Sequence, residues 1–197
     1  MKNETYNQLA ALTLSDKFHC TLPEQQQLLH AAIGLQTEVG ELFAAVRLGQ
    51  KHFYQFDRVN FLEEIGDAAW YLSIPQRILA FDIEKYDSSE FTRVTMRDQD
   101  VFGDDLYHLN QNTTEFLDII KKQTFYGRNP KQEDVQYLLG QIYTGLRLLT
   151  NHVRGDWNTV LKNNIDKLAA RYEGAFSEFL ANNRDLAAEY TILARSK

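Results

Sequence analysis

The sequence predicts an all-α protein, and three observations support this fold class. Only three prolines and ten glycines occur among 197 residues, so long stretches run without the residues that interrupt helices. Apolar residues recur at helical spacings in several of these stretches. The hydrophobic fraction of 44% and the aromatic fraction of 12% are sufficient for one buried core or for two small fused ones.

Each expected helix follows from its own residue pattern. Residues 28–47 carry one broad apolar stripe, whereas residues 59–79 are apolar on nearly every side and are expected to be interrupted or kinked near Pro75. The polar segment 87–104 fits a surface helix or an ordered loop. Gly127 and Pro130 separate the next two helices. These and the last two helices are expected at residues 106–122, 133–153, 157–171 and 175–193.

The two halves of the chain match each other at a constant offset of 74 residues. The matched pairs include Leu35 with Leu109, Gly66 with Gly140 and Asp82 with Asp156. Generic amphipathic helices can produce partial matches by coincidence, but a constant offset across two helices and their connection argues for an internal repeat. We therefore expect a helical bundle built as a tandem pseudo-dimer, with residues 1–104 and 105–197 as halves packed into one domain.

Charge, cysteine content and hydropathy exclude several classes. With 27 acidic and 21 basic residues the formal net charge is -6, which disfavours duplex nucleic acid as a partner. The single cysteine, Cys20, excludes an intrachain disulfide and a cysteine-rich zinc site, and we expect it to be a small buried residue. No segment has the apolar length of a membrane span or of a signal peptide, so a cytoplasmic protein without a membrane partner is expected.

Four acidic residues form the candidate metal site. Glu38 and Glu41 lie three residues apart in one expected helix, and Glu64 and Asp67 lie three apart in the next. Both pairs border apolar surface, and Glu38, Glu64 and Asp67 lack a basic residue four positions further on. Buried carboxylates require protonation, a cationic partner or a metal. Carboxylate oxygens are the ligands that Mg²⁺ prefers.

Other interpretations of these acids remain open at this stage. Either pair alone is more often a solvated helix face. The acids could also pair with distant arginines such as Arg77 or Arg147 in a purely structural bundle. A ferritin-like di-iron site is disfavoured, because the sequence has no Glu-x-x-His motif at these positions.

The motifs EVGE and EIGD, with their flanks LHAAIGLQTEVGEL and VNFLEEIGDAAWYL, resemble the MazG-like members of the all-α NTP pyrophosphohydrolase superfamily. That superfamily also contains dimeric dUTPases and phosphoribosyl-ATP pyrophosphohydrolases. The resemblance implies Mg²⁺-dependent hydrolysis of an NTP or dNTP to the monophosphate and pyrophosphate, with Mn²⁺ able to substitute. It implies that Glu38, Glu41, Glu64 and Asp67 bind the metal and that Glu38 or Glu41 is the catalytic base.

A second resemblance lies near the C-terminus, in NNIDKLAARY and NNRDLAAE. It implies that Asn164 and Lys167 contact the substrate phosphates, with Arg171 and Tyr172 as weaker candidates. The alternative for Lys167 and Arg171 is an exposed basic helix face.

The two halves differ at both predicted sites. Opposite the four acids the second half offers Asn112, Glu115, Leu138 and Gln141, and opposite Asn164, Lys167 and Arg171 the first half offers Glu90, Arg93 and Arg97. One complete site per chain is therefore expected, in a monomer or a homodimer.

Two further questions stay open at the level of the sequence. A non-catalytic nucleotide-binding or structural protein derived from the same fold is the alternative function. Trp70, Phe53 and Tyr54 could stack on a base, although such aromatics more often pack in a core.

Overall fold

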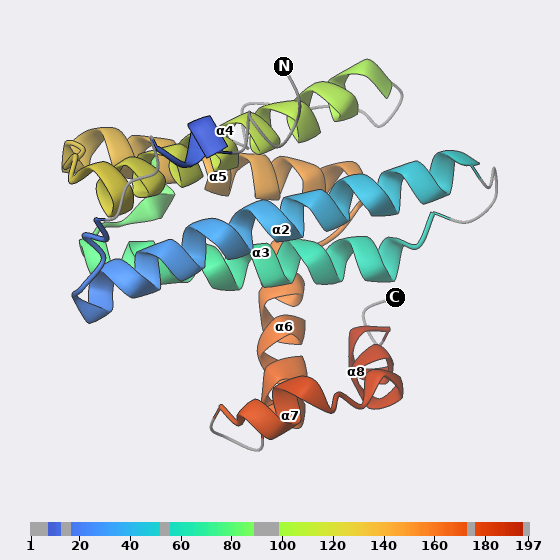
Figure 1. Cartoon of the computed structure of the whole chain (residues 1–197). Helices are drawn as coiled ribbons and strands as arrows, with labels where there is room; N and C mark the ends of the chain where they lie inside the picture. Colours follow the sequence, from blue (N-terminus) through green and yellow to red (C-terminus); the bar gives the residue numbers. More distant parts are fainter. Residues whose placement is uncertain (1–7, 13–16, 52–55, 89–98, 173–175, 195–197) are drawn as a thin grey trace.

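The computed structural model describes residues 8–12, 17–51, 56–88, 99–172 and 176–194. Within these ranges the regular structure is helical, which confirms the predicted all-α class (Figure 1). The main elements are α2 (Pro23–Lys51), α3 (Arg58–Leu79), the 3₁₀ helix η1 (Ile83–Tyr86), α4 (Gln99–Tyr126), α5 (Gln132–His152), α6 (Trp157–Tyr172), α7 (Glu178–Asn182) and α8 (Leu186–Leu193).

Four long helices form a bundle, and a C-terminal arm leaves it. Helix α2 packs against α3 and α4, and α5 packs against the same two helices. Figure 1 shows α6 running away from this bundle and carrying α7 and α8 at its far end. Helix α6 packs on α3, and α7 and α8 pack on α6. We call α6, α7 and α8 the C-terminal arm.

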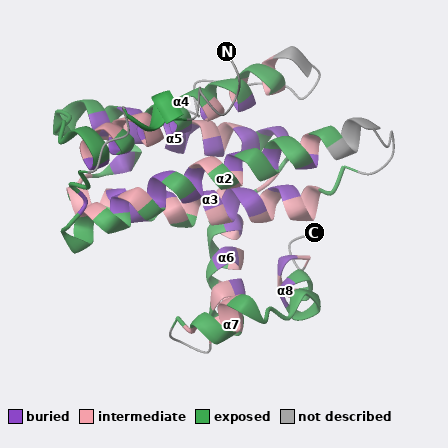
Figure 2. Cartoon of the chain, in the orientation of Figure 1, coloured by how far each residue is buried: buried purple, intermediate pink, exposed green. Residues whose placement is uncertain are grey.

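The core is one continuous cluster drawn from both predicted halves. It includes Leu35 and Leu42 of α2, Ile65 of α3, and Phe116 and Leu146 of α4 and α5. Figure 2 shows buried residues concentrated inside the bundle, whereas α7 and α8 are largely exposed. Cys20 is 2% exposed, as expected for a small buried residue. No helix of the described ranges is both long and apolar enough to span a membrane.

Helix α3 continues through Pro75 to Leu79, so the predicted interruption is wrong. Pro75 is buried near the end of the helix, where the lost backbone hydrogen bond affects only the last turns. The helix begins after Asp57, whose side chain accepts a hydrogen bond from the Asn60 amide. It ends at Ala80, which adopts a left-handed conformation with φ of 48°.

Other predicted boundaries also change, and α2 is longer at both ends than the predicted range 28–47. Helix α4 begins at Gln99, inside the segment 87–104 that was expected to be a surface helix or loop, while residues 89–98 lie outside the described ranges. The predicted helix 175–193 is two helices, α7 and α8. They separate because Asp185 caps α8 by accepting from the Ala188 amide, and the Asn183 side chain donates to the Phe179 carbonyl at the end of α7.

Three hydrogen bonds follow the offset of 74 residues between the two halves. Gln36 donates from Nε2 to Oδ1 of Asn110 at 3.0 Å, and these two residues are each other's counterparts. Arg58 donates to the Val153 carbonyl and its counterpart Gln132 donates to the Leu79 carbonyl, so each half makes the same contact to the other.

The same offset appears in the backbone. Ala80 and its counterpart Arg154 are the two non-glycine residues of the described ranges with positive φ, at 48° and 56°. Both residues therefore take the left-handed conformation just after a helix, Ala80 at the end of α3 and Arg154 two residues beyond the end of α5.

Candidate functional site

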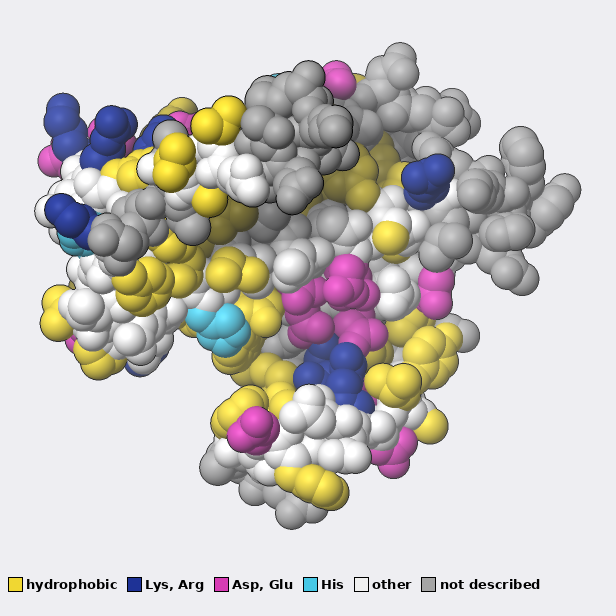
Figure 3. Space-filling view, in the orientation of Figure 1, with side chains coloured by type: hydrophobic (Ala, Val, Ile, Leu, Met, Phe, Trp, Pro, Cys, Tyr) yellow, Lys and Arg dark blue, Asp and Glu magenta, His cyan; other side chains and the backbone are white. Residues whose placement is uncertain are grey.

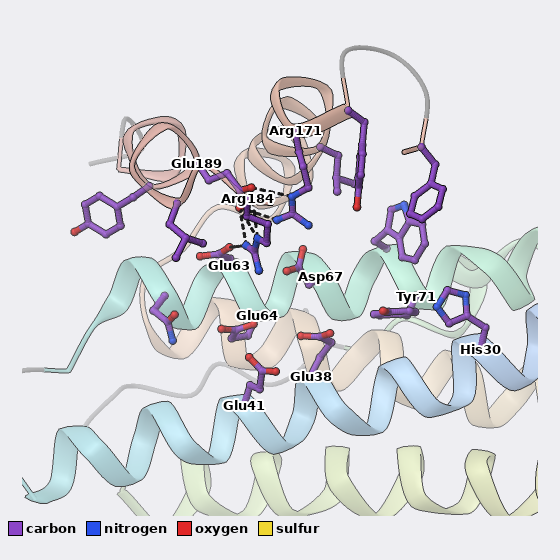
Figure 4. A pocket seen from close by; sticks show the side chains of 17 residues that line it. His30, Glu38, Glu41, Glu63, Glu64, Asp67, Tyr71, Arg171, Arg184 and Glu189 are labelled. Atoms are coloured by element: carbon purple, nitrogen blue, oxygen red, sulfur yellow. Dashed lines mark hydrogen bonds and ion pairs between the residues drawn. The ribbon is translucent and has the colours of Figure 1, made fainter. Parts of the chain in front are cut away.

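Three glutamates from two neighbouring helices converge on one point. Glu38 and Glu41 come from α2 and Glu64 comes from α3, and one oxygen of each lies within 4.8 Å of the other two. The helices approach closely because Gly34 of α2 faces the ring of Tyr71, where an added Cβ would lie 2.2 Å from Cε1. Figure 4 shows the three side chains pointing toward one another between the two helices.

The environment of Glu64 and Glu38 opposes the ionisation of both carboxyl groups. Burial raises the pKa of Glu64 to about 8, with further contributions from Glu41 and Glu38. Burial likewise raises the pKa of Glu38 to about 7, aided by the charges of Asp67 and Glu41. Glu64 is 7% exposed, whereas Glu41 is exposed to solvent. Buried carboxyl groups in this setting either retain their protons or accept a cation, and the three glutamates together offer the oxygen ligands that a metal ion needs.

Asp67 lies beside these three acids but already forms an ion pair with a lysine of the protein. The Nζ atom of Lys167, from α6, lies 2.6 and 2.7 Å from the two carboxylate oxygens of Asp67 and 3.0 Å from Oε1 of Glu63. Asn164 donates to Oδ1 of Asp67 at 2.6 Å. Lys167 is 0% exposed, so its charge is matched by Asp67 and Glu63 inside the protein.

Close packing brings α6 near enough for these contacts. A Cβ added to Gly66 of α3 would lie 3.1 Å from the Cβ atom of Asn164. The glycine therefore allows α6 to lie against α3 one turn from the acidic side chains.

Two arginines and a buried glutamate form the opposite wall. Arg171 donates from Nε and Nη2 to the two oxygens of Glu189 at 2.8 and 2.6 Å. Arg184 donates from Nη2 to Oε2 of the same carboxylate at 2.6 Å and lies 3.7 Å from Oε1 of Glu63. Burial alone would raise the pKa of Glu189, but the hydrogen bonds from both arginines outweigh it and lower the pKa to about 2. Glu189 is therefore ionised at neutral pH.

A pocket of about 610 Å³ connects these groups. Figure 3 shows the acidic side chains gathered where the bundle meets the C-terminal arm, with lysine and arginine side chains directly beside them. One end of the pocket is aromatic: Trp70 and Tyr71 pack edge to face at 4.9 Å between ring centroids, and His30 packs on Tyr71 at 5.4 Å. Tyr172 and Phe176 line the same pocket. This volume lies within the usual range for small-molecule sites.

The structure brings most of the sequence-predicted site residues together. Glu38, Glu41, Glu64, Asp67 and Arg171 all line this pocket, whereas Asn164 and Lys167 lie behind Asp67 and are absent from its described lining. The alternative of an exposed basic face is wrong for Lys167, which is buried, and for Arg171, whose side chain is 13% exposed.

Of the remaining residues considered from the sequence, Trp70 and Tyr172 are among the described residues that line the pocket. Arg77 donates to Gln27 and Arg147 pairs with Asp87, so neither neutralises the four acids. Trp70 is 38% exposed at the pocket, while Phe53 and Tyr54 lie outside the described residues, as do Glu90, Arg93 and Arg97.

Sequence reasoning missed Glu63, Arg184 and Glu189. Glu63 directly precedes Glu64, lines the same pocket and contacts both Lys167 and Arg184. Arg184 and Glu189 are five residues apart, which is no helical pairing distance, and their contact depends on the turn that Asp185 makes before α8.

Comparisons of the chain with known protein families, with curated proteins and with solved structures find no match.

Proposed function

We propose that this protein is a metal-dependent nucleoside triphosphate pyrophosphohydrolase, converting an NTP or dNTP and water into the monophosphate and pyrophosphate. The observation that carries the proposal is the convergence of Glu38, Glu41 and Glu64 in one pocket, where no described lysine or arginine forms an ion pair with any of the three. A buried acid without a counter-charge, as Glu64 is, destabilises the fold, and a bound divalent cation removes that cost. The group that fits this donor set is Mg²⁺, with Mn²⁺ as its substitute.

The charges of the pocket are arranged for a polyphosphate. The three acids occupy one wall, and Arg171 and Arg184 occupy the other. The aromatic end of the pocket, with Trp70 and Tyr71, offers flat apolar surface for a nucleobase. A polyphosphate with a planar base at one end fits a pocket that is charged along its walls and aromatic at one end, whereas a free phosphate would leave the aromatic end empty.

The chain's own residues account for the remaining chemistry. When bound, Mg²⁺ supplies charge neutralisation of the phosphates and a more acidic water. Glu38 or Glu41 takes the proton from the attacking water, which adds to the α-phosphorus while the bond to the bridging oxygen breaks and pyrophosphate leaves. Arg171 offsets the charge on the leaving group. Lys167 and Asn164 hold the Asp67 carboxylate in place behind the pocket.

We also propose that the fold is MazG-like and arose as a tandem pseudo-dimer with one degenerate half. Two observations support this: Gln36 contacts Asn110, its own counterpart 74 residues on, and the contact of Arg58 with Val153 is repeated by their counterparts Gln132 and Leu79. A two-fold interface has this reciprocity, because each contact occurs twice and residues on the axis meet their own counterparts. The packing of the helices has the same symmetry. The offset of 74 residues relates α3 to α5 and η1 to the start of α6, and α5 packs on η1 as α3 packs on α6.

The deciding experiment is pyrophosphate release from a panel of NTPs and dNTPs with Mg²⁺ or Mn²⁺. We expect metal-dependent release that Glu38→Gln and Asp67→Asn each reduce by about 10²-fold or more. The matched control is Glu115→Gln, which changes the exposed counterpart of Glu41 in the second half and should leave release unchanged. No release from any nucleotide by folded, metal-loaded protein would exclude the enzyme and leave a nucleotide-binding or structural bundle.

A further inference from the structure

We propose that Glu189 is a positioning residue that fixes Arg171 and Arg184 as a binding site for the terminal phosphates of a polyphosphate. The inference rests on the proposed function, because it assigns one end of the substrate to one wall of the same pocket. It also assigns a role to Arg184, the more exposed of the two arginines, with a side chain 38% exposed.

The burial and the bonding of Glu189 argue for a fixed group rather than a surface ion pair. The residue is 3% exposed, and each of its oxygens accepts from a guanidinium group. Helix α8 holds it in place, since Asp185 caps the start of the helix and Leu193 is buried at its end. An exposed pair would contribute little, whereas a buried carboxylate with two guanidinium partners restricts both of them.

The geometry leaves binding capacity on the arginines. A guanidinium has five N–H donors, and Glu189 takes the Nε and Nη2 edge of Arg171 and of Arg184. The Nη1 group of Arg184 therefore lies on the edge turned away from Glu189. The trio carries two positive charges and one negative charge, and the next acid, Glu63, lies 3.7 Å from Arg184 and is shared with Lys167. Figure 4 shows it across the pocket from Glu38, Glu41 and Glu64.

The effect of replacing Glu189 by glutamine distinguishes a residue that positions the two arginines from one that only competes with phosphate for them. If Glu189 only competed with phosphate for the arginines, replacing it by glutamine would add a net positive charge and strengthen anion binding. If it positions them, the same change frees two mutually repelling guanidinium groups and weakens binding. Expelling a buried carboxylate in favour of phosphate is costly, so positioning is the expected result.

The test is calorimetric binding of inorganic tripolyphosphate with saturating Mg²⁺ to wild type and to Glu189→Gln. We expect Glu189→Gln to weaken binding about tenfold and to leave the affinity for Mg²⁺ alone unchanged. The matched control is Asp166→Asn, which makes the same charge change in an exposed pair with Lys162 on α6 and should have no effect. Unchanged or tighter tripolyphosphate binding by Glu189→Gln would overturn the proposal.

A second variant covers the case in which Glu189→Gln loosens α8. Arg184→Lys keeps the charge at a partly exposed position but removes the planar two-point contact, so it should also weaken tripolyphosphate binding, by about fivefold. Wild-type affinity in Arg184→Lys would equally refute the proposal. The outcome is independent of catalysis, because a protein that binds tripolyphosphate in this way yet releases no pyrophosphate from nucleotides would refute only the enzyme.

Discussion

Replacing Glu64 by glutamine should stabilise the metal-free protein at alkaline pH. Folding raises the pKa of this carboxyl from 4.5 to about 8, mainly through burial. The folded protein therefore binds this proton more tightly than the unfolded chain does. Its stabilising contribution is complete below pH 4.5 and declines as the pH rises toward 8. Glutamine does not ionise in this pH range, so the stability of the variant should not fall for this reason.

The size of the pKa change determines how much stability Glu64→Gln should gain. At about 1.4 kcal/mol per pKa unit the upper bound is about 5 kcal/mol, which screening by water in the open pocket reduces to about 2 kcal/mol. For a chain of 197 residues that corresponds to a Tm difference of about 4–8 °C. We expect this difference at pH 8.5 and almost none at pH 5, measured by circular dichroism with a chelator present.

With Mg²⁺ present, wild type should become more stable than Glu64→Gln. At about 100 times its Kd a ligand adds about 2.7 kcal/mol to the stability of the protein that binds it, so wild type should gain where Glu64→Gln does not. Glu115→Gln, at an exposed position of α4, serves as the control and should follow wild type at both pH values. If Glu64→Gln is no more stable than wild type at pH 8.5 without metal, the acids are compensated within the protein and the argument for a cation fails.

Three further outcomes follow from other parts of the structure. Lys167→Met removes the ammonium that contacts Asp67, and denaturant unfolding should show a loss of about 3–5 kcal/mol; a loss below 1 kcal/mol would mean that the pair is effectively solvated. Gly140→Ala places a Cβ 2.2 Å from the Cβ atom of Tyr86 and should cost about 2 kcal/mol or more. Gly103→Ala, which meets open space in α4, should be neutral or slightly stabilising, and equal effects of the two would contradict the packing. Trp70→Ala should raise KM for nucleotides about tenfold with little change in tripolyphosphate affinity, whereas equal losses would exclude a base contact.

Local periodicity was sufficient to predict the bundle and part of the site. The apolar stripe of α2 identifies its buried face, and the three-residue spacing of Glu38 and Glu41 places both on one side. Glu64 joins them because α3 is apolar on nearly every side and must pack against a neighbour. These inferences need only the helical repeat and the burial of apolar surface.

The contacts to the C-terminal arm lie beyond such reasoning. Lys167 reaches Asp67 across 100 residues of sequence, and no periodicity relates α6 to α3. Only the resemblance to a known family brought Lys167 to the site, and it suggested a phosphate contact rather than a buried partner for Asp67. The pairing of Arg184 with Glu189 depends on a turn between two short helices, where local propensities are weak.

The contact between Lys167 and Asp67 also means that the pocket should stay assembled at low protein concentration. Both residues belong to one chain, and the helices that carry them pack together in the same fold. Two groups joined by a polypeptide meet at an effective concentration of about millimolar or higher. A pocket assembled between separate subunits would lose one wall as the subunits dissociate. Here the acidic wall and the arm that closes it stay together in a single molecule, even when the protein is scarce.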